Sequence, residues 1–201
     1  MGASRVCREL SRQQTFHKGA VQFTLGLCAK GNIGIISARH NTVKHRIAHM
    51  FAADVMLGRT ARWLRLLGCD TFYRPSIGND ELLFKSLLEG RILLTRDTNL
   101  ARRAGAAAYL VRSNDLWGQL REICAQFGLA HVLTLERCSV CNGELTEVEK
   151  DSIAGTVPAY TFLTHDKFFQ CANCGKVFWE GSHVRLAEHD IQEKLGENEN
   201  T

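Results

Sequence analysis

Proline and long apolar runs are scarce in this chain. Only 2 of its 201 residues are proline and 45% are hydrophobic, a composition that excludes collagen-like, disordered and coiled-coil proteins. No segment approaches the roughly 18 consecutive apolar residues of a membrane-spanning helix, so we expect no membrane association. The sequence also lacks a glycine-rich phosphate loop, a G-x-S-x-G motif and a dinucleotide fingerprint, and it offers no sign of the enzyme classes that use them.

Charge is distributed unevenly, although the formal net charge is only +4. Residues 1–50 contain 8 basic and 1 acidic residue, residues 51–112 contain 10 and 6, and residues 113–201 contain 7 and 14. Any positive field that would attract a nucleic acid is therefore local, because the last segment carries the opposite sign.

Residues 1–49 contain no recognisable motif, because polar residues and glycine interrupt every apolar run. Three interpretations remain open: a basic nucleic-acid-binding arm, an Arg-rich transit-like segment, or a translated stretch upstream of the true start. The third is attractive because Met50 to Asp54 would make a natural beginning. We treat residues 1–49 as an unassigned basic leader, for which disorder and absence from the functional product both remain open.

From Met50 onward, strand-like and helix-like patterns alternate four times. The expected strands are 51–53, 71–73, 92–95 and 108–111, and the expected helices are 57–67, 79–89, 98–104 and 115–127. This alternation predicts an α/β domain with a parallel sheet and right-handed crossovers. Beyond Gly128 the pattern changes to short β-like runs at 160–163, 168–170 and 177–179, followed by an amphipathic helix over 182–195.

Four of the eight cysteines form two C-x-x-C pairs with 29 residues between them: Cys138, Cys141, Cys171 and Cys174. Two such turns complete a tetrahedral four-thiolate shell, which predicts one structural zinc ion per chain in a reducing, cytoplasmic compartment. Asn142-Gly143 and Gly175 supply flexible residues after each pair. The alternative is a thioredoxin-like redox pair. We interpret His183 as a residue that packs near this module, with metal ligation or acid–base chemistry as alternatives.

Four aspartates occupy the positions that follow strands or begin helices: Asp54, Asp80, Asp97 and Asp115. In an open parallel sheet these positions lie at one edge, beyond the carboxyl ends of the strands, where ligands bind. Clustered carboxylates repel one another unless cations neutralise them, so the pattern favours a magnesium or manganese site for phosphodiester hydrolysis. The alternative is that these aspartates merely favour helix starts.

Arginines accompany these carboxylates. Arg59, Arg62 and Arg65 recur at three-residue intervals on an expected helix, and Arg96 precedes Asp97. They suit a polyanionic substrate, and we take Arg59, Arg62 and Arg96 as candidate phosphate contacts. For each arginine alone, the alternative is a solvated helix face.

Five blocks in this order resemble the Mut-seven C-terminal RNase domain family: Met56–Gly68, Gly90–Asp97, Arg137–Asn142, Cys171–Gly175 and Trp179–His183. That family joins a PIN-like nuclease fold to a C-terminal zinc ribbon. The resemblance implies a three-layer, PIN-like parallel sheet domain, a small four-cysteine zinc ribbon and a metal-dependent ribonuclease activity with RNA as the partner.

The resemblance also implies roles for single residues. Asp54, Asp80 and Asp97 match the family's acids that would hold magnesium or manganese, and Asp115 matches a fourth acid more weakly. Asn99 stands where some PIN relatives place another carboxylate, which leaves open whether one or two metal ions bind.

The expected organisation is a leader, a nuclease domain, a linker, a zinc ribbon and a C-terminal helix with a frayed tail, at residues 1–49, 50–128, 129–136, 137–183 and 184–201. The expected function is a hydrolase that cleaves RNA. The alternative is a catalytically silent nucleic-acid or protein adaptor of the same fold. The sequence leaves the RNA substrate, the cleavage mode and the oligomeric state open.

Overall fold

The computed structural model describes residues 16–17, 22–23 and 49–196. The chain separates into two compact units, residues 1–46 and 47–201. In the first unit, strands β1 (Phe16–His17) and β2 (Gln22–Phe23) pair in antiparallel orientation. The other predictions for residues 1–48 lie outside the described residues.

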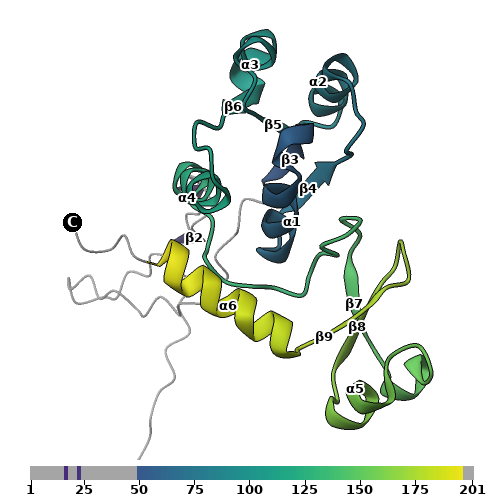
Figure 1. Ribbon diagram of the computed structural model, residues 1–201. Coiled ribbons are helices and arrows are strands. Elements are labelled where there is room, and N and C mark those ends of the chain that lie inside the picture. The colour runs from purple at the N-terminus through teal and green to yellow at the C-terminus, as the bar shows by residue number, and fades with distance from the viewer. Residues whose placement is uncertain (1–15, 18–21, 24–48, 197–201) are drawn as a thin grey trace, which may run out of the picture. The chain divides into compact units, whose positions relative to one another are not determined.

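A four-stranded parallel sheet forms the centre of the second unit (Figure 1). Its spatial order is β4-β3-β5-β6, and every neighbouring pair is parallel. The bounds are β3 (Met50–Ala53), β4 (Asp70–Tyr73), β5 (Ile92–Thr95) and β6 (Ala108–Leu110). The predicted parallel α/β architecture is therefore confirmed.

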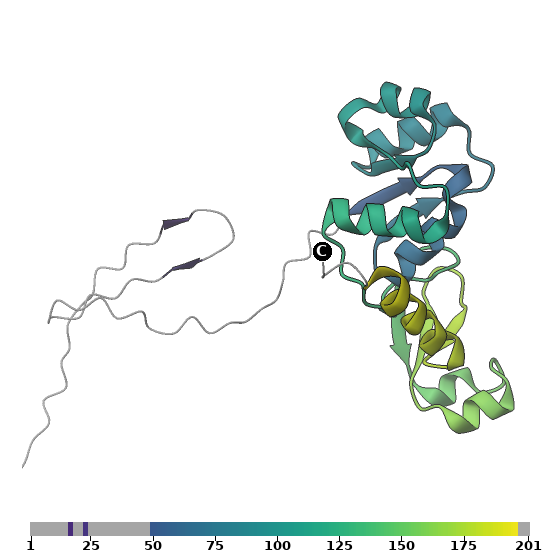
Figure 2. The ribbon, with the colours of Figure 1, turned by 60° about the vertical axis from the view of Figure 1, so that its left-hand side comes forward.

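Helices cover both faces of this sheet, as Figures 1 and 2 show. α1 contacts α4 on one face, and α2 contacts α3 on the other. The bounds are η1 (Val55–Leu57), α1 (Gly58–Leu66), α2 (Asn79–Leu88), α3 (Thr98–Ala104), η2 (Gly105–Ala107) and α4 (Leu116–Phe127). Successive strand residues point to opposite faces, so Phe51 and Ala53 belong to the core under α1 and α4, whereas Ala52 belongs to the core under α2 and α3.

The strand order reverses between β3 and β5, which predicts a crevice at the carboxyl ends of these two strands. The chain runs from β3 to β4 on one side and then returns past β3 to form β5 on the other side. Parallel sheets bind ligands beyond the carboxyl ends of the strands at such a reversal. Asp54 follows β3, and Arg96-Asp97 follows β5, so these residues lie at this edge.

The cysteine-bearing module contains a three-stranded antiparallel sheet in the order β7-β8-β9. Its elements are β7 (Leu145–Val148), η3 (Lys150–Ile153), α5 (Ala159–Thr164), β8 (Phe168–Cys171) and β9 (Val177–Trp179). The predicted β-like run at 160–163 is wrong, because these residues form α5. Pro158 precedes its first turn, where proline is compatible with a helix, and the carbonyl of Pro158 accepts a hydrogen bond from the N–H of Phe162 (3.0 Å).

The chain returns to the first core through α6 (Ser182–Leu195), at the bounds predicted from the sequence. Ile191 and Leu195 are buried in the core under α1 and α4. Residues 129–136, predicted as a linker, also contact this core, since the N–H of Thr134 donates to the carbonyl of Leu66 (2.9 Å). Within the described residues, none of the helices has the length and apolar character needed to cross a membrane.

Candidate active site and metal centre

Asp54 is the most buried of the four candidate aspartates, with 1% of its surface exposed. Its Oδ1 accepts a hydrogen bond from the N–H of Val55 (2.6 Å), and its Oδ2 accepts one from Oγ1 of Thr95 (2.5 Å). Among residues 49–196 no Lys, Arg or His forms an ion pair with it. A buried carboxylate held only by neutral donors is costly, and such groups commonly coordinate a cation.

Asp97 is connected to Asp54 through Thr95. The hydroxyl oxygen of Thr95 accepts a hydrogen bond from the N–H of Asp97 (2.9 Å) while it donates to Asp54. Oδ1 of Asp97 caps α3 by accepting from the N–H groups of Asn99 and Leu100 (2.7 and 3.2 Å). Both aspartates therefore lie at the carboxyl ends of β3 and β5, joined through Thr95.

Asp80 and Asp115 have other partners. Asp80 forms an ion pair with Arg103, and 87% of its side chain is exposed. Asp115 is the N-cap of α4, and the N–H of Gly118 donates to it (2.9 Å), which lowers the pKa of Asp115. In the part of the chain that the structure describes, no three of the four aspartates bring oxygen atoms within 4.8 Å of one another.

Two residues at this edge were missed by the sequence reasoning. Thr95 joins Asp54 to Asp97, and Nδ2 of Asn79 donates to Oδ2 of Asp97 (3.2 Å). Asn79 is adjacent to Asp80, so α2 does approach the crevice. The signal for Thr95 was its place at the end of β5, where a hydroxyl interrupts an otherwise apolar run.

The candidate arginines differ in exposure. Arg59 and Arg62 are exposed on α1, whereas Arg65 is only 4% exposed and does not contribute to a positive surface. Arg96 is half-buried and donates through Nη2 to Oδ1 of Asn114. Its Nε is buried and has no hydrogen-bond partner among residues 49–196.

The four cysteines of the two C-x-x-C pairs cluster, with all four Sγ atoms within 4.8 Å of one another. Sγ of Cys138 lies 3.8 Å from that of Cys174, and Sγ of Cys141 lies 3.4 Å from that of Cys171. A tetrahedral zinc ion with bonds of about 2.3 Å requires sulfur–sulfur distances of about 3.8 Å. The donor set and its spacing therefore fit zinc.

Two equivalent turns hold these cysteines. The N–H of Asn142 donates to the carbonyl of Cys138, and the N–H of Gly175 donates to the carbonyl of Cys171, both at 2.9 Å. Asn142 and Gly175 both have φ of 72°, the left-handed conformation that ends each turn. A Cβ on Gly143 would lie 2.8 Å from Sγ of Cys171, so this position requires glycine.

The thiols differ in their proton affinity. Burial raises the pKa of Cys138 to about 12. Burial also acts to raise the pKa of Cys141, but hydrogen bonds from the backbone of Gly143 and from neighbouring cysteines outweigh it and lower the pKa to about 6. Because ligand thiols must be deprotonated, zinc binding here would release the proton of Cys138 at neutral pH.

Residues 49–191 match the family described as the Mut7-C RNAse domain. The chain belongs to this family. The match spans the parallel sheet, the cysteine cluster and most of α6, and it confirms the resemblance seen in the sequence. Membership indicates a nuclease with RNA as its substrate. No curated protein and no solved structure matches the chain.

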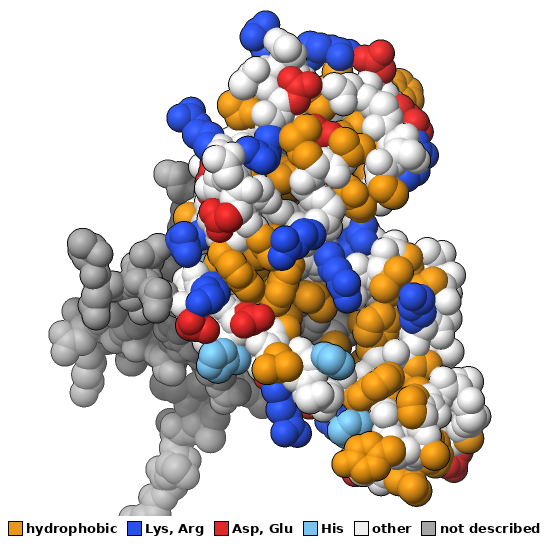
Figure 3. Space-filling view, in the orientation of Figure 1, with side chains coloured by type: hydrophobic (Ala, Val, Ile, Leu, Met, Phe, Trp, Pro, Cys, Tyr) orange, Lys and Arg blue, Asp and Glu red, His pale blue; other side chains and the backbone are white. Residues whose placement is uncertain are grey.

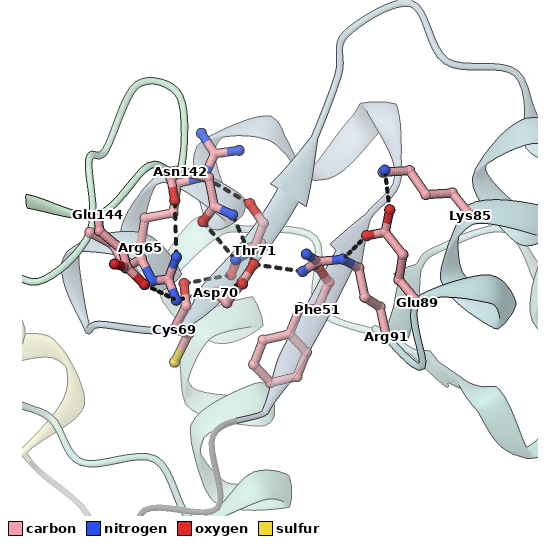
Figure 4. A network of polar contacts seen from close by, with 11 residues as sticks. Phe51, Arg65, Cys69, Asp70, Thr71, Lys85, Glu89, Arg91, Asn142 and Glu144 are labelled. Carbon is pink, nitrogen blue, oxygen red and sulfur yellow. Dashed lines mark hydrogen bonds and ion pairs between the residues drawn. The ribbon is translucent and has the colours of Figure 1, made fainter. Parts of the chain in front are cut away.

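In this Mut7-C RNAse domain, the first cysteine turn is tied to the parallel sheet by Arg65 (Figure 4). Nε of Arg65 donates to the carbonyl of Thr71 (2.8 Å), and Nη1 donates to the carbonyls of Val140 (2.9 Å) and Ser139 (3.3 Å). Oδ1 of Asn142 accepts from the N–H of Thr71 (2.8 Å). The guanidinium therefore contacts the backbone between Cys138 and Cys141 directly.

Asp70 at the start of β4 completes this network. It accepts hydrogen bonds from Nη1 of Arg91 (2.6 Å) and Nδ2 of Asn142 (2.8 Å), and Nη2 of Arg137 lies 3.6 Å away. Burial acts to raise the pKa of Asp70, but these hydrogen bonds and the positive charges outweigh it and lower its pKa. The carboxylate is thus ionised and joins the cysteine turn to the edge of the sheet.

Proposed function

We propose that the protein is a metal-dependent, PIN-like ribonuclease that hydrolyses RNA phosphodiesters at the crevice between β3 and β5. The observation that carries the proposal is the buried Asp54 carboxylate, which has no basic partner among residues 49–196 and is connected to Asp97 through Thr95. Membership in an RNAse domain family supplies the substrate class.

The carboxylate oxygens at this crevice suit a hard divalent cation. Asp54 and Asp97 would hold magnesium or manganese, and Asp80 is the third candidate because its neighbour Asn79 already contacts Asp97. When bound, such an ion activates a water molecule and stabilises the leaving oxygen of a phosphodiester. Thr95 would orient the Asp54 carboxylate, since its hydroxyl donates to Oδ2. Asp115, at the N-cap of α4, would complete the ligand shell of the metal ion or orient the attacking water.

The arginines would bind the substrate. Arg96 directly precedes Asp97, and its half-buried guanidinium would donate to a phosphate oxygen of the cleaved bond. Arg59 and Arg62 on α1 would contact neighbouring phosphates. The four cysteines would hold a structural zinc ion, because a closed set of four thiolates leaves no position for substrate.

The test is cleavage of labelled single-stranded and structured RNA by the full-length, zinc-loaded protein with manganese or magnesium. We expect Asp97→Asn to lose at least about 100-fold in rate, while it remains folded because asparagine also caps helices. Asp151→Asn, at an exposed position in η3, is the matched control and should cleave like the wild type. Activity that survives in Asp97→Asn would refute the site, and a wild type that cleaves no RNA would favour the adaptor.

A further inference from the structure

A cavity of about 730 Å³ lies between α1 and the cysteine-bearing module. Arg59, Arg62 and Trp63 of α1 line one wall, and their i, i+3, i+4 spacing places them on one helix face. Phe169 of β8 and Phe178 of β9 also line the cavity. Figure 3 shows Lys and Arg side chains beside hydrophobic ones across the middle of this face of the molecule. The volume is in the range of pockets that enclose small organic ligands.

The cavity contains groups that a nucleobase can use. Trp63 is held in place by Trp117 of α4, with ring centroids 4.9 Å apart, so it presents a fixed aromatic surface. Thr134 also lines the cavity. His183, expected to pack near the cysteine module, is exposed and lines the same cavity. Several rings beside polar side chains suit a flat, polar-edged ligand.

Charges of both signs line the cavity. Arg59 and Arg62 lie on α1, whereas Glu136, Glu180 and Glu188 lie in the loop before the cysteines, after β9 and on α6. Phosphates would be repelled by the glutamates and attracted to α1. A nucleotide would therefore place its phosphates along α1 and its base across the cavity, where carboxylates can accept hydrogen bonds from exocyclic amino groups.

The helix that lines the cavity begins close to the proposed catalytic edge. α1 begins four residues after Asp54, and only the turn η1 separates them. With a rise of about 1.5 Å per residue, Arg62 lies about 6 Å along the helix from Gly58. An RNA strand that follows α1 from the cavity therefore reaches Asp54 within a few nucleotides.

We infer that this cavity binds one unpaired nucleobase of a single-stranded RNA substrate, stacked among Trp63, Phe169 and Phe178, while Arg59 and Arg62 hold its phosphates. This inference rests on the proposed function and adds to it, because it assigns single-stranded RNA as the substrate and gives the cysteine module a part in binding. A base in the cavity fixes the strand relative to the crevice, so the module positions the bond to be cleaved.

The test is binding of a fluorescent single-stranded RNA oligonucleotide to the full-length, zinc-loaded protein without added magnesium or manganese, so that no cleavage intervenes. We expect Phe178→Ala to weaken binding roughly tenfold without changing its salt dependence, because stacking involves no ion release. Arg62→Ala should weaken binding and reduce the slope of log K against log salt by about 1. Tyr160→Ala, which removes an exposed ring on α5, and Arg102→Ala, which removes an exposed arginine on α3, are the matched controls.

An oligonucleotide with abasic sites separates stacking from general binding. The wild type should bind it about as weakly as Phe178→Ala binds the intact strand, and Phe178→Ala should lose little more. Equal effects of the cavity variants and the controls would overturn the inference, even if the wild type cleaves RNA. The predicted binding pattern without any cleavage would leave the cavity assigned and would refute the catalytic proposal instead. Absence of RNA binding would also overturn the inference and leave a protein ligand as the occupant to seek.

Discussion

Replacing Arg65 by alanine tests how the cysteine-bearing module is held against the parallel sheet. The guanidinium makes three hydrogen bonds to backbone carbonyls, at 2.8, 2.9 and 3.3 Å, and it lies almost entirely out of water. Arg65→Ala would leave these carbonyls without their donor. Hydrogen bonds from charged donors contribute about 1.5–3 kcal/mol each, and such contributions are not additive, so we expect a loss of about 3 kcal/mol.

The assay is urea unfolding of the zinc-loaded protein, followed by circular dichroism. With a slope near 2 kcal/mol per molar urea, the midpoint should fall by about 1.5 M. Arg62→Ala removes the same side chain from an exposed position of the same helix and should change stability by less than about 0.5 kcal/mol. A loss below about 1 kcal/mol for Arg65→Ala would show that the docking of the cysteine turn does not depend on this network.

Three other predictions follow from the site. Gly143→Ala should lower zinc affinity at least about tenfold in a chelator competition, because its Cβ would press against Sγ of Cys171; unchanged affinity would mean that the turn relaxes without cost. Asp70→Asn should destabilise the protein at pH 7, and the difference in unfolding free energy from the wild type should shrink below about pH 4. The folded pKa of Asp70 is lowered, so the stabilisation by its carboxylate is present above the unfolded pKa of 3.8. This stabilisation is lost as the pH falls through the folded pKa. A deficit that is constant with pH in paired unfolding curves would contradict this. If Glu136, Glu180 and Glu188 face the base, oligo(C), which carries an amino donor, should bind more tightly than oligo(U); equal affinities would place the base edge elsewhere.

The parallel sheet was predictable because its two central strands, β3 and β5, are buried on both faces. Ile92–Thr95 is a continuous apolar run between a glycine-stopped helix and a polar turn, and the strand has these bounds in the structure. The Tyr160–Leu163 run was misjudged because four residues rich in β-prone side chains are too few to reveal a period. β7 was not predicted because Thr146 and Glu147 face solvent at the edge of the small sheet.

The difference in exposure among the arginines on α1 follows from helix geometry. A three-residue step falls about 60° short of a full turn, so Arg59 and Arg65 lie about 120° apart around the helix. Arg59 and Arg62 can therefore share an exposed face while Arg65 turns toward Thr71 and the cysteine turn. Spacing alone predicted a common surface, whereas the burial of Arg65 depends on a module that begins about 70 residues later.

The arrangement of the candidate aspartates was also predictable only in part. The positions of Asp54 and Asp97 after β3 and β5 were readable, because parallel strands end at one edge. Their connection through Thr95 was not, since it depends on the register between the two strands. The cavity between α1 and the cysteine module was also beyond prediction, because it arises only when α6 returns to the first core.

The most direct test of the central claim is manganese-dependent RNA cleavage by Asp54→Asn. Asparagine has the shape of aspartate and can keep hydrogen bonds to Val55 and Thr95, but it lacks the charge that would hold a cation. We expect this variant to remain folded, to retain zinc and single-stranded RNA binding, and to cleave at least about 100-fold more slowly than the wild type. Cleavage at the wild-type rate would contradict this expectation.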